Sequence, residues 1–205
     1  VELSDVSSWF QSKGWEAFEF QKRAWKNYAN GEFGIVNTPT GSGKTYSLLI
    51  PVLLDISNGG KSGLQAIWVT PIRALAKEIL QSGQRATDGM KLDVTIEIRT
   101  GDTSAKDKAR IKKSPPNILI TTPESLHVML SQKHYDKYFS NLKAVIIDEW
   151  HDLIGSKRGV QMELALSKFK VLSPSLKIWG ISATIGNMEE SLKVLLGDWY
   201  NSKPH

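Results

Sequence analysis

Thr38-Pro-Thr-Gly-Ser-Gly-Lys-Thr45 decides the fold of this chain, because a loop of this composition typically follows a strand and opens a helix. Gly41 and Gly43 let backbone N–H groups converge on an anion, since no Cβ obstructs the approach. Lys44 would reach the β- and γ-phosphates of a nucleotide, and the Thr45 hydroxyl would bind Mg²⁺. The N-terminus of the helix adds partial positive charge. The loop therefore predicts a nucleoside triphosphate site.

The flanking sequence supports this interpretation. Gly34-Ile-Val36 is typical of a short strand that enters the loop, and Tyr46-Ser-Leu-Leu-Ile50 of a helix that leaves it. Thr38 stands where the general phosphate-loop pattern has glycine, which we interpret as a subtype. The alternative is a chance Gly/Ser/Thr loop before a helix, which the flanking elements make improbable. The residues predicted to bind the nucleotide phosphates are Thr40, Gly41, Ser42, Gly43, Lys44 and Thr45.

Two adjacent carboxylates end the apolar run Ala144-Val-Ile-Ile147, in the segment Asp148-Glu-Trp-His151. Ligands of open α/β sheets bind outside the carboxyl ends of the strands, so these acids should face the phosphate loop. Asp148 would hold Mg²⁺, and Glu149 would orient or deprotonate the attacking water. Such acids can also simply cap a helix, and a lone histidine is usually structural. The phosphate loop favours catalysis by Lys44, Asp148 and Glu149, and a coupling role for His151.

Composition narrows the class of protein further. The chain has 205 residues, no cysteine and a formal net charge of +5, with a pI near 9.3. Disulfides and thiolate catalysis are excluded, and the charge favours an anionic partner such as nucleotide or nucleic acid. No stretch is long and apolar enough to span a membrane, and the N-terminus lacks a signal-peptide pattern. We expect a cytoplasmic protein with no membrane partner.

Strands and helices alternate along the chain, which predicts a three-layer α/β/α domain with a mainly parallel sheet. A helical segment over residues 1–30 precedes the sheet, and the six expected strands with their helices fill residues 1–205 as a single domain. Strands are expected at 33–37, 65–69, 93–99, 117–120, 143–147 and 177–181. Helices are expected at 4–13, 20–30, 44–57, 72–85, 124–131, 161–172 and 188–196.

Five further segments lie upstream of the phosphate loop or at strand ends. They are Phe18-Glu-Phe-Gln21, Thr70-Pro-Ile-Arg-Ala-Leu75, Thr100-Gly-Asp-Thr103, Thr121-Thr-Pro-Glu-Ser-Leu126 and Ser182-Ala-Thr184. In this order they resemble the first RecA-like domain of superfamily 2 helicases, of the DExH group. The segments 14–21, 99–103 and 148–159 are similar to those of the Lhr family, and most similar to the ligase-associated DEXH-box helicases of bacteria.

The resemblance implies roles for these segments. Gln21 would contact adenine beside Phe18 or Phe20, and Ser182 and Thr184 would couple nucleotide state to domain closure through Asp148 or His151. Lys157 and Arg158 are typical of the family, with no assigned role. Each threonine can alternatively be a helix cap, but five such segments in the expected order favour the helicase interpretation. Nucleic-acid contacts are predicted for Thr70, Pro71, Arg73, Thr100, Gly101 with its neighbour Asp102, Thr121, Thr122 and Pro123.

By the same resemblance, the chain is the ATP-binding motor domain of an ATP-dependent, 3′-to-5′ DNA helicase or translocase in DNA repair, using ATP and Mg²⁺. Single-stranded DNA is the favoured partner, and a DNA ligase and a nuclease of a repair pathway are further partners. A second RecA-like domain, which supplies arginines to the cleft, is not found in these 205 residues, so slow hydrolysis is expected of them alone. The alternatives are an RNA helicase, a non-unwinding nucleic-acid remodelling ATPase, and a nucleotide-dependent switch.

Overall fold

The computed structural model describes residues 3–39, 43–60, 62–183, 186–202 and 205. Within these residues, six strands form one sheet in the order β1-β6-β5-β2-β4-β3, and every neighbouring pair is parallel. The predicted α/β fold with a parallel sheet is therefore confirmed. The strands are β1 (Gly34–Asn37), β2 (Ala66–Val69), β3 (Ile96–Arg99), β4 (Ile118–Thr121), β5 (Ala144–Ile147) and β6 (Lys177–Ser182).

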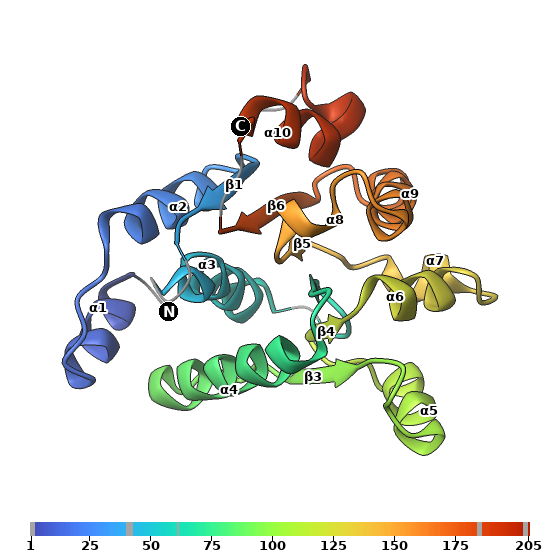
Figure 1. The fold of residues 1–205 in the computed structure, drawn as a ribbon. Coiled ribbons are helices and arrows are strands. Elements are labelled where there is room, and N and C mark those ends of the chain that lie inside the picture. The colour runs from blue at the N-terminus through green and yellow to red at the C-terminus, as the bar shows by residue number, and fades with distance from the viewer. Residues whose placement is uncertain (1–2, 40–42, 61, 184–185, 203–204) are drawn as a thin grey trace.

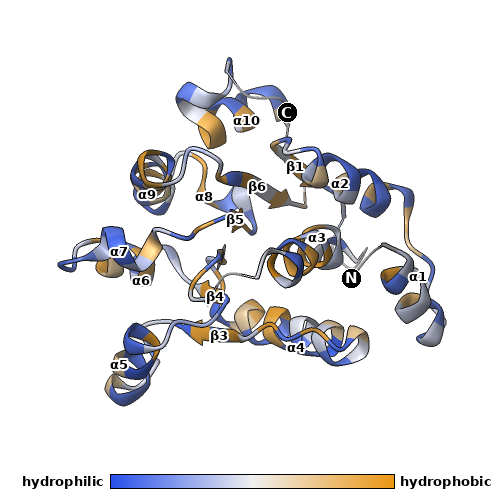
Figure 2. Cartoon of the chain, turned by 180° about the vertical axis from the view of Figure 1, so that it is seen from behind, coloured by the Kyte–Doolittle hydropathy of each residue, from blue (hydrophilic) through white to orange (hydrophobic). Residues whose placement is uncertain are grey.

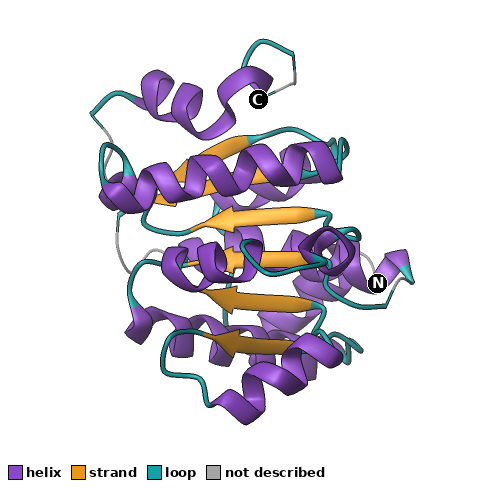
Figure 3. Ribbon diagram, turned by 90° about the vertical axis from the view of Figure 1, so that its right-hand side faces the viewer, coloured by secondary structure: helices purple, strands orange, loops and turns teal. Residues whose placement is uncertain are grey.

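Helices cover both faces of this sheet (Figures 1 and 3). The helices packed on one face are α1 (Leu3–Ser12), α2 (Glu19–Ala29), α3 (Lys44–Gly59) and α4 (Arg73–Met90). Those on the other are α5 (Ala105–Lys113), α6 (Pro123–Leu130), α7 (Tyr135–Phe139), α8 (Trp150–Leu153), α9 (Lys157–Leu172) and α10 (Met188–Leu196), followed by a short 3-10 turn at Gly197–Trp199.

Alternate residues of each central strand enter different cores. In β5, Ala144 and Ile146 face α2–α4, whereas Val145 and Ile147 face α6, α8 and α9. All four are buried, since a parallel sheet covered on both faces has no solvated side. Figure 2 shows the apolar colour on the strands and on α3 and α4, while α5 is mainly hydrophilic. The apolar runs in the sequence thus become the two layers of core on either side of the sheet.

Three short helices were not expected. The helix α5 buries only Ile111, so it carries no apolar periodicity, although Ser104 caps it by accepting a hydrogen bond from the Asp107 backbone N–H. The helices α7 and α8 each begin after a residue in the left-handed region, His134 and Glu149. Non-glycine residues rarely adopt this conformation, so sequence patterns give little warning of such turns.

Other elements differ from expectation at their ends. The helix α4 runs five residues beyond the expected Arg85 and ends at Met90. The next residue, Lys91, caps it in the left-handed region. The strand β3 starts at Ile96, because Thr95 instead bonds through its N–H and hydroxyl to the side chain of Asn117. The helix α9 starts at Lys157, four residues early, because Ser156 accepts from the Gly159 N–H. Polar side chains near element ends decided these boundaries.

All six strands point the same way, so the segments that follow them gather at one edge of the sheet (Figure 3). The strand β6 lies between β1 and β5, although it is the last strand in the chain. This order brings the phosphate loop after β1 and the acids after β5 to either side of Ser182. No helix in the described part of the chain has the length and apolar character needed to cross a membrane.

Candidate functional site

The phosphate loop connects β1 to α3. At its start, the Thr38 N–H donates to the Ser182 carbonyl at 3.2 Å, which extends the pairing of β1 with β6. At its end, Gly43 has φ 75° and precedes the first turn of α3. A side chain at Gly43 would be strained by this φ and would lie 3.1 Å from Gln21 Nε2, so glycine is required here. The predicted phosphate ligands Thr40, Gly41 and Ser42 lie outside the described residues.

Gln21 is fully engaged by the backbone around this loop. Its Oε1 accepts from the Phe18 N–H at 2.9 Å, and its Nε2 donates to the Gly43 carbonyl at 2.8 Å. The side chain therefore ties the start of α2 to the end of the phosphate loop. Phe18 is 56% exposed and stacks on Phe20, with ring centroids 5.7 Å apart. The exposed Phe18 ring is positioned at the loop, and contact of these residues with adenine stays a prediction.

Asp148 ends β5 in a buried position, 5% exposed. Its carboxylate accepts hydrogen bonds from the Glu149 N–H at 2.9 Å and from Trp68 Nε1, on the neighbouring strand β2, at 3.4 Å. Burial, and next the charge of Glu149, raise the pKa of Asp148 to about 6. A divalent cation would oppose both effects, because its charge favours the ionised carboxylate and offsets the repulsion from Glu149.

Glu149 is held in an unusual backbone conformation, with φ 50° and ψ 43°. The left-handed region costs a non-glycine residue about 1 kcal/mol, and such strain is concentrated at functional sites. Its carboxylate lies 3.1 Å from Lys44 Nζ, with both side chains largely buried at 11% and 13% exposure. The turn thus directs the Glu149 side chain toward Lys44 of the phosphate loop, while the Asp148 side chain stays buried at the end of β5. The two acids occupy different environments despite being adjacent in sequence.

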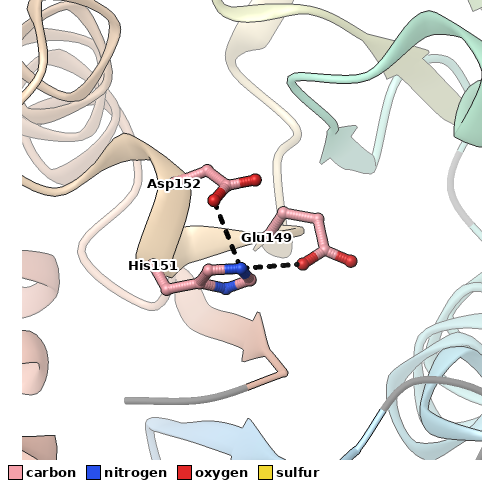
Figure 4. Close-up of side chains that lie close together, drawn as sticks. All are labelled: Glu149, His151 and Asp152. Atoms are coloured by element: carbon pink, nitrogen blue, oxygen red, sulfur yellow. Dashed lines mark ion pairs between the residues drawn. The ribbon is translucent and has the colours of Figure 1, made fainter. Parts of the chain in front are cut away.

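His151 connects the acids to β6. Its Nδ1 is 2.7 Å from the Ser182 hydroxyl, and its Nε2 lies 3.4 Å from Glu149 and 3.3 Å from Asp152 (Figure 4). Ligand atoms of Glu149, His151 and Asp152 all lie within 4.8 Å of one another. The His151 ring therefore connects the Glu149 carboxylate to the end of β6. Thr184, the other predicted coupling residue, lies outside the described residues.

The predicted nucleic-acid residues differ sharply in exposure. Arg73, Gly101 and Asp102 are exposed, whereas the other predicted contact residues are buried. The buried hydroxyls are used within the protein. Thr121 Oγ1 donates to the Arg99 carbonyl at 2.6 Å, and Thr122 caps α6. These threonines orient the strand-end loops, and direct contacts with nucleic acid stay predictions. The buried set comprises Thr70, Pro71, Thr100, Thr121, Thr122 and Pro123.

Two arginines organise the surface beside these loops. Arg73 Nη1 donates to both carboxylate oxygens of Asp102, at 2.7 and 2.8 Å, which links the start of α4 to the loop after β3. Arg158 donates to the Pro71 carbonyl at 2.8 Å and pairs with Glu124 at 2.6 Å. Arg158, which sequence reasoning left without a role, therefore ties α9 to the segments after β2 and β4. The Lys157 side chain makes no hydrogen bond or ion pair with the described residues that would explain its place beside Arg158.

Sequence reasoning assigned no role to Trp68 or Asp152. Trp68 is an apolar strand residue by pattern, and only the pairing of β2 with β5 brings its indole N–H to Asp148. Asp152 is one residue past His151, and the short helix α8 places both side chains on the same side as Glu149 (Figure 4). The signal for Asp152 in the sequence is a histidine with one acid directly after it and another, Glu149, two residues before it. No comparable signal existed for Trp68.

Comparison with known proteins identifies the family. A family model described as DEAD/DEAH box helicase matches residues 18–191. The chain belongs to the DEAD/DEAH box helicase family. The helicase Lhr-Core of Methanothermobacter thermautotrophicus, named as ATP-dependent, is 31% identical over 212 residues, covering 97% of this chain and 25% of that protein. Together with the Lhr structure described next, this makes the helicase domain an Lhr-like first RecA-like domain of superfamily 2.

Two solved structures resemble the helicase domain closely. The structure of Mycobacterium smegmatis helicase Lhr bound to ssDNA and AMP-PNP has a TM-score of 0.87 and 28% identity, covering 98% of this chain and 26% of that one. The structure of the DUF1998 helicase MrfA bound to DNA and AMPPNP has a TM-score of 0.83 and 27% identity, covering 98% and 28%. The chain spans about a quarter of the length of the relatives it matches.

Proposed function

We propose that this chain is the ATP-binding half of the motor of a DNA helicase or translocase. The observation that carries the proposal is the cluster at the carboxyl edge, where Lys44 meets Glu149 and His151 meets Ser182. These contacts join the phosphate loop, the acidic segment and β6 into one unit. The Lhr and MrfA structures with DNA and a nucleotide analogue support DNA as the substrate. We retain 3′-to-5′ movement and a role in DNA repair as parts of the proposal.

Mg²⁺ fits the residues present. The Thr45 hydroxyl and the Asp148 carboxylate are oxygen donors of the kind that this ion prefers. The buried Asp148, whose pKa is raised by burial and by the charge of Glu149, is a natural partner for a cation. When bound, the ion would neutralise charge on the terminal phosphates of ATP. Asp148 would orient it mostly through water, while the Trp68 indole holds one carboxylate oxygen in place.

Lys44 and Glu149 would act on the triphosphate itself. In this structure each neutralises the other at 3.1 Å. An incoming triphosphate offers Lys44 a stronger anion, so Glu149 would become free to accept a proton from the attacking water. Gln21 would contact the adenine edge beside Phe18 or Phe20. Nucleotide binding and preparation of the base are thus linked through a single ion pair.

His151 would report the state of Glu149 to the rest of the motor. Its hydrogen bond with Ser182 reaches the end of β6, where the chain continues to Thr184. A change in the position of Glu149 would alter the ion pair with His151 Nε2 and, through the ring, the contact with Ser182. A second RecA-like domain of the full-length protein would complete the ATP cleft and supply arginines. We keep a ligase and a nuclease of a repair pathway as its partners, the ligase-associated helicases as its closest subgroup, and the cytoplasm as its location.

The ATPase rate of the full-length protein, with and without single-stranded DNA across salt concentrations, tests the proposal. We expect strong stimulation that fades as salt rises, because backbone phosphates dominate such binding. Stimulation by RNA alone would assign an RNA helicase. Stimulation without strand separation in an unwinding assay would assign a remodelling ATPase. Hydrolysis indifferent to any nucleic acid would overturn the motor and leave a nucleotide-dependent switch.

The variant Lys44→Ala tests the nucleotide site separately. Loss of a charge aimed at the transferring phosphate should lower the ATPase rate by roughly 10²–10³-fold and abolish detectable Mg²⁺-dependent nucleotide binding. Lys26→Ala, an exposed lysine on α2, is the matched control and should change neither. Normal nucleotide binding by Lys44→Ala would disprove the assignment of the loop.

A further inference from the structure

A groove of about 440 Å³ lies at the carboxyl edge of the sheet. It adjoins the edge strand β3, which Figure 1 shows between α4 and α5. It is lined by residues of α4, of the loop after β3, of α5 and of the start of α6. Arg73 and Gly101 belong to the predicted nucleic-acid track, whereas Lys108, Lys112 and Ser125 lie beyond it. The groove thus overlaps the predicted track, which also supplies Thr100 and Thr122 to its lining, and continues beyond it toward α5.

Arg99 is the buried charge of this groove. It is 5% exposed, and its Nε has no hydrogen-bond partner among the described residues. Burial lowers the pKa of Arg99, since the charged form is poorly solvated there. A guanidinium without a counter-charge is costly to bury, because its lost hydration is not replaced. Arg99 has no ion pair within the described part of the chain, which indicates that a binding partner supplies the missing anion.

The surrounding residues do not supply that anion. Tyr138 is the group that acts electrostatically on Arg99, but burial raises the pKa of Tyr138 to about 12, so it is neutral at pH 7. Glu124, the acid that lines the groove, already pairs with Arg158 at 2.6 Å. A void of about 20 Å³ beside Arg99 has room for roughly one water, which could accept a hydrogen bond but would bring no negative charge.

The groove favours a phosphate as the anion. The helix α5 carries five cations, Lys106, Lys108, Arg110, Lys112 and Lys113, against one acid, Asp107. Lys112 lines both the groove and the void beside Arg99. The N-terminus of α6 adds partial positive charge from the opposite wall, and arginine presents a donor fork that matches phosphate oxygens. A chain of phosphates running along the strand-end loops would place one of them here.

We propose that Arg99 and Lys112 bind one backbone phosphate of the tracked nucleic-acid strand, in the groove between α5 and α6. This inference rests on the proposed function and extends the strand's path beyond the strand-end loops to α5. The contact reads charge and not sequence, because phosphates carry no base information. Arg99 is a binding residue in this assignment, distant from the phosphate loop and from the acids after β5.

Methylphosphonate scanning of single-stranded DNA, bound to the full-length protein, tests this directly. Each oligonucleotide carries one neutral linkage at a defined position. We expect affinity of the wild type to fall about tenfold or more at one particular linkage, as for loss of a hydrogen bond to a charged group. Arg99→Met should bind unmodified DNA correspondingly more weakly and be insensitive to that linkage. Arg99→Lys should restore part of both. Arg110→Met, an exposed arginine of the same helix that pairs with Glu97, is the matched control and should respond like the wild type.

The thermal midpoint of unfolding without DNA separates binding from a structural role. Arg99→Met removes an uncompensated buried charge, so the midpoint should stay level or rise while DNA affinity falls. A fall in both would indicate that Arg99 supports the fold, and the exposed Lys112→Met, which leaves the core untouched, would then decide by its response at the same linkage. An unchanged linkage profile in both variants overturns the inference.

Two further outcomes separate a failure of the proposed function from a failure of the phosphate contact. A wild-type protein that binds no nucleic acid refutes the proposed function, whatever Arg99 does. A wild type that binds DNA with no sensitive linkage, yet binds inorganic phosphate in a manner lost in Arg99→Met, would assign the groove to a free phosphate and overturn the strand contact.

Discussion

Buried charges are compensated differently at the two ends of the carboxyl edge of the sheet, near β5 and β6 and near β3. Around β5 and β6, the charged groups are partnered within the chain, as Lys44 is with Glu149 at 3.1 Å. Around β3, Arg99 is buried, and its Nε donates no hydrogen bond to any of the residues that the structure describes. A site that hydrolyses a triphosphate needs a base beside a cation, so the two neutralise each other in the absence of ligand. A site that only binds a polyanion needs no acid beside each cation, so a buried cation such as Arg99 can await its counter-charge from the ligand.

The largest effect that would sharpen this contrast is expected from Glu149→Gln. Removal of the base should lower the DNA-stimulated ATPase rate by about 10²–10⁴-fold. Nucleotide binding should persist or tighten, since Lys44 loses the carboxylate that competes for it. ATPase and nucleotide-binding assays on the full-length protein measure both, with Glu163→Gln, an exposed acid of α9, as the control. Undiminished hydrolysis would show that another residue activates water.

Asp148→Asn tests whether the charge of the Asp148 carboxylate is incompletely compensated when no metal ion is bound. The pKa of Asp148 is raised to about 6, so the folded protein holds this proton more tightly than the unfolded chain. Its contribution to stability is therefore present at low pH and lost as pH rises from about 4 through 6. Relative to wild type, the variant should gain about 2–3 kcal/mol between pH 4 and 7.5. Urea unfolding without Mg²⁺ measures this, with the exposed Asp136→Asn as the control. Parallel pH profiles of variant and wild type would contradict the shift.

A double-mutant cycle on His151 and Ser182 tests the contact that links the acidic segment after β5 to the end of β6. Their hydrogen bond of 2.7 Å should give a coupling free energy of about 1 kcal/mol in unfolding experiments on His151→Ala, Ser182→Ala and the double variant. The ratio of DNA-stimulated to basal ATPase activity should fall in each single variant. Additive effects on both measurements would remove His151 from the coupling route.

The smallest effect is expected from Arg73→Ala. The side chains of its ion pair with Asp102 are 62% and 69% exposed, so water competes with the pair. Its loss should change the unfolding free energy by less than about 0.5 kcal/mol. Denaturant titration of variant and wild type measures the difference. If the free energy of unfolding falls by several kcal/mol, the pair supports the fold. Ion pairs near β3 would then stabilise the chain as the buried pair near β5 does.

Much of the site follows from short segments of sequence. The phosphate loop identifies Lys44, and the apolar run before Asp148 identifies a buried strand with acids at its carboxyl end. The alternation of strands and helices then predicts parallel strands, whose carboxyl ends meet at one edge. These are local patterns, set by backbone conformation and by the periodicity of burial. They are sufficient to place the loop and the acids, separated by about a hundred residues, in one site.

Tertiary structure alone decided which partner each side chain has. Trp68 meets Asp148 because β2 pairs with β5, and Ser182 meets His151 because β6 lies between β1 and β5. The burial of Thr121 and Arg99, and hence which strand-end residues can touch a ligand, also follows from how α5, α6 and α7 cover the sheet. Sequence by itself determined the fold class and the chemical groups at the nucleotide site. Burial and partnership are sums over neighbours distant in sequence, so only the folded chain could assign them.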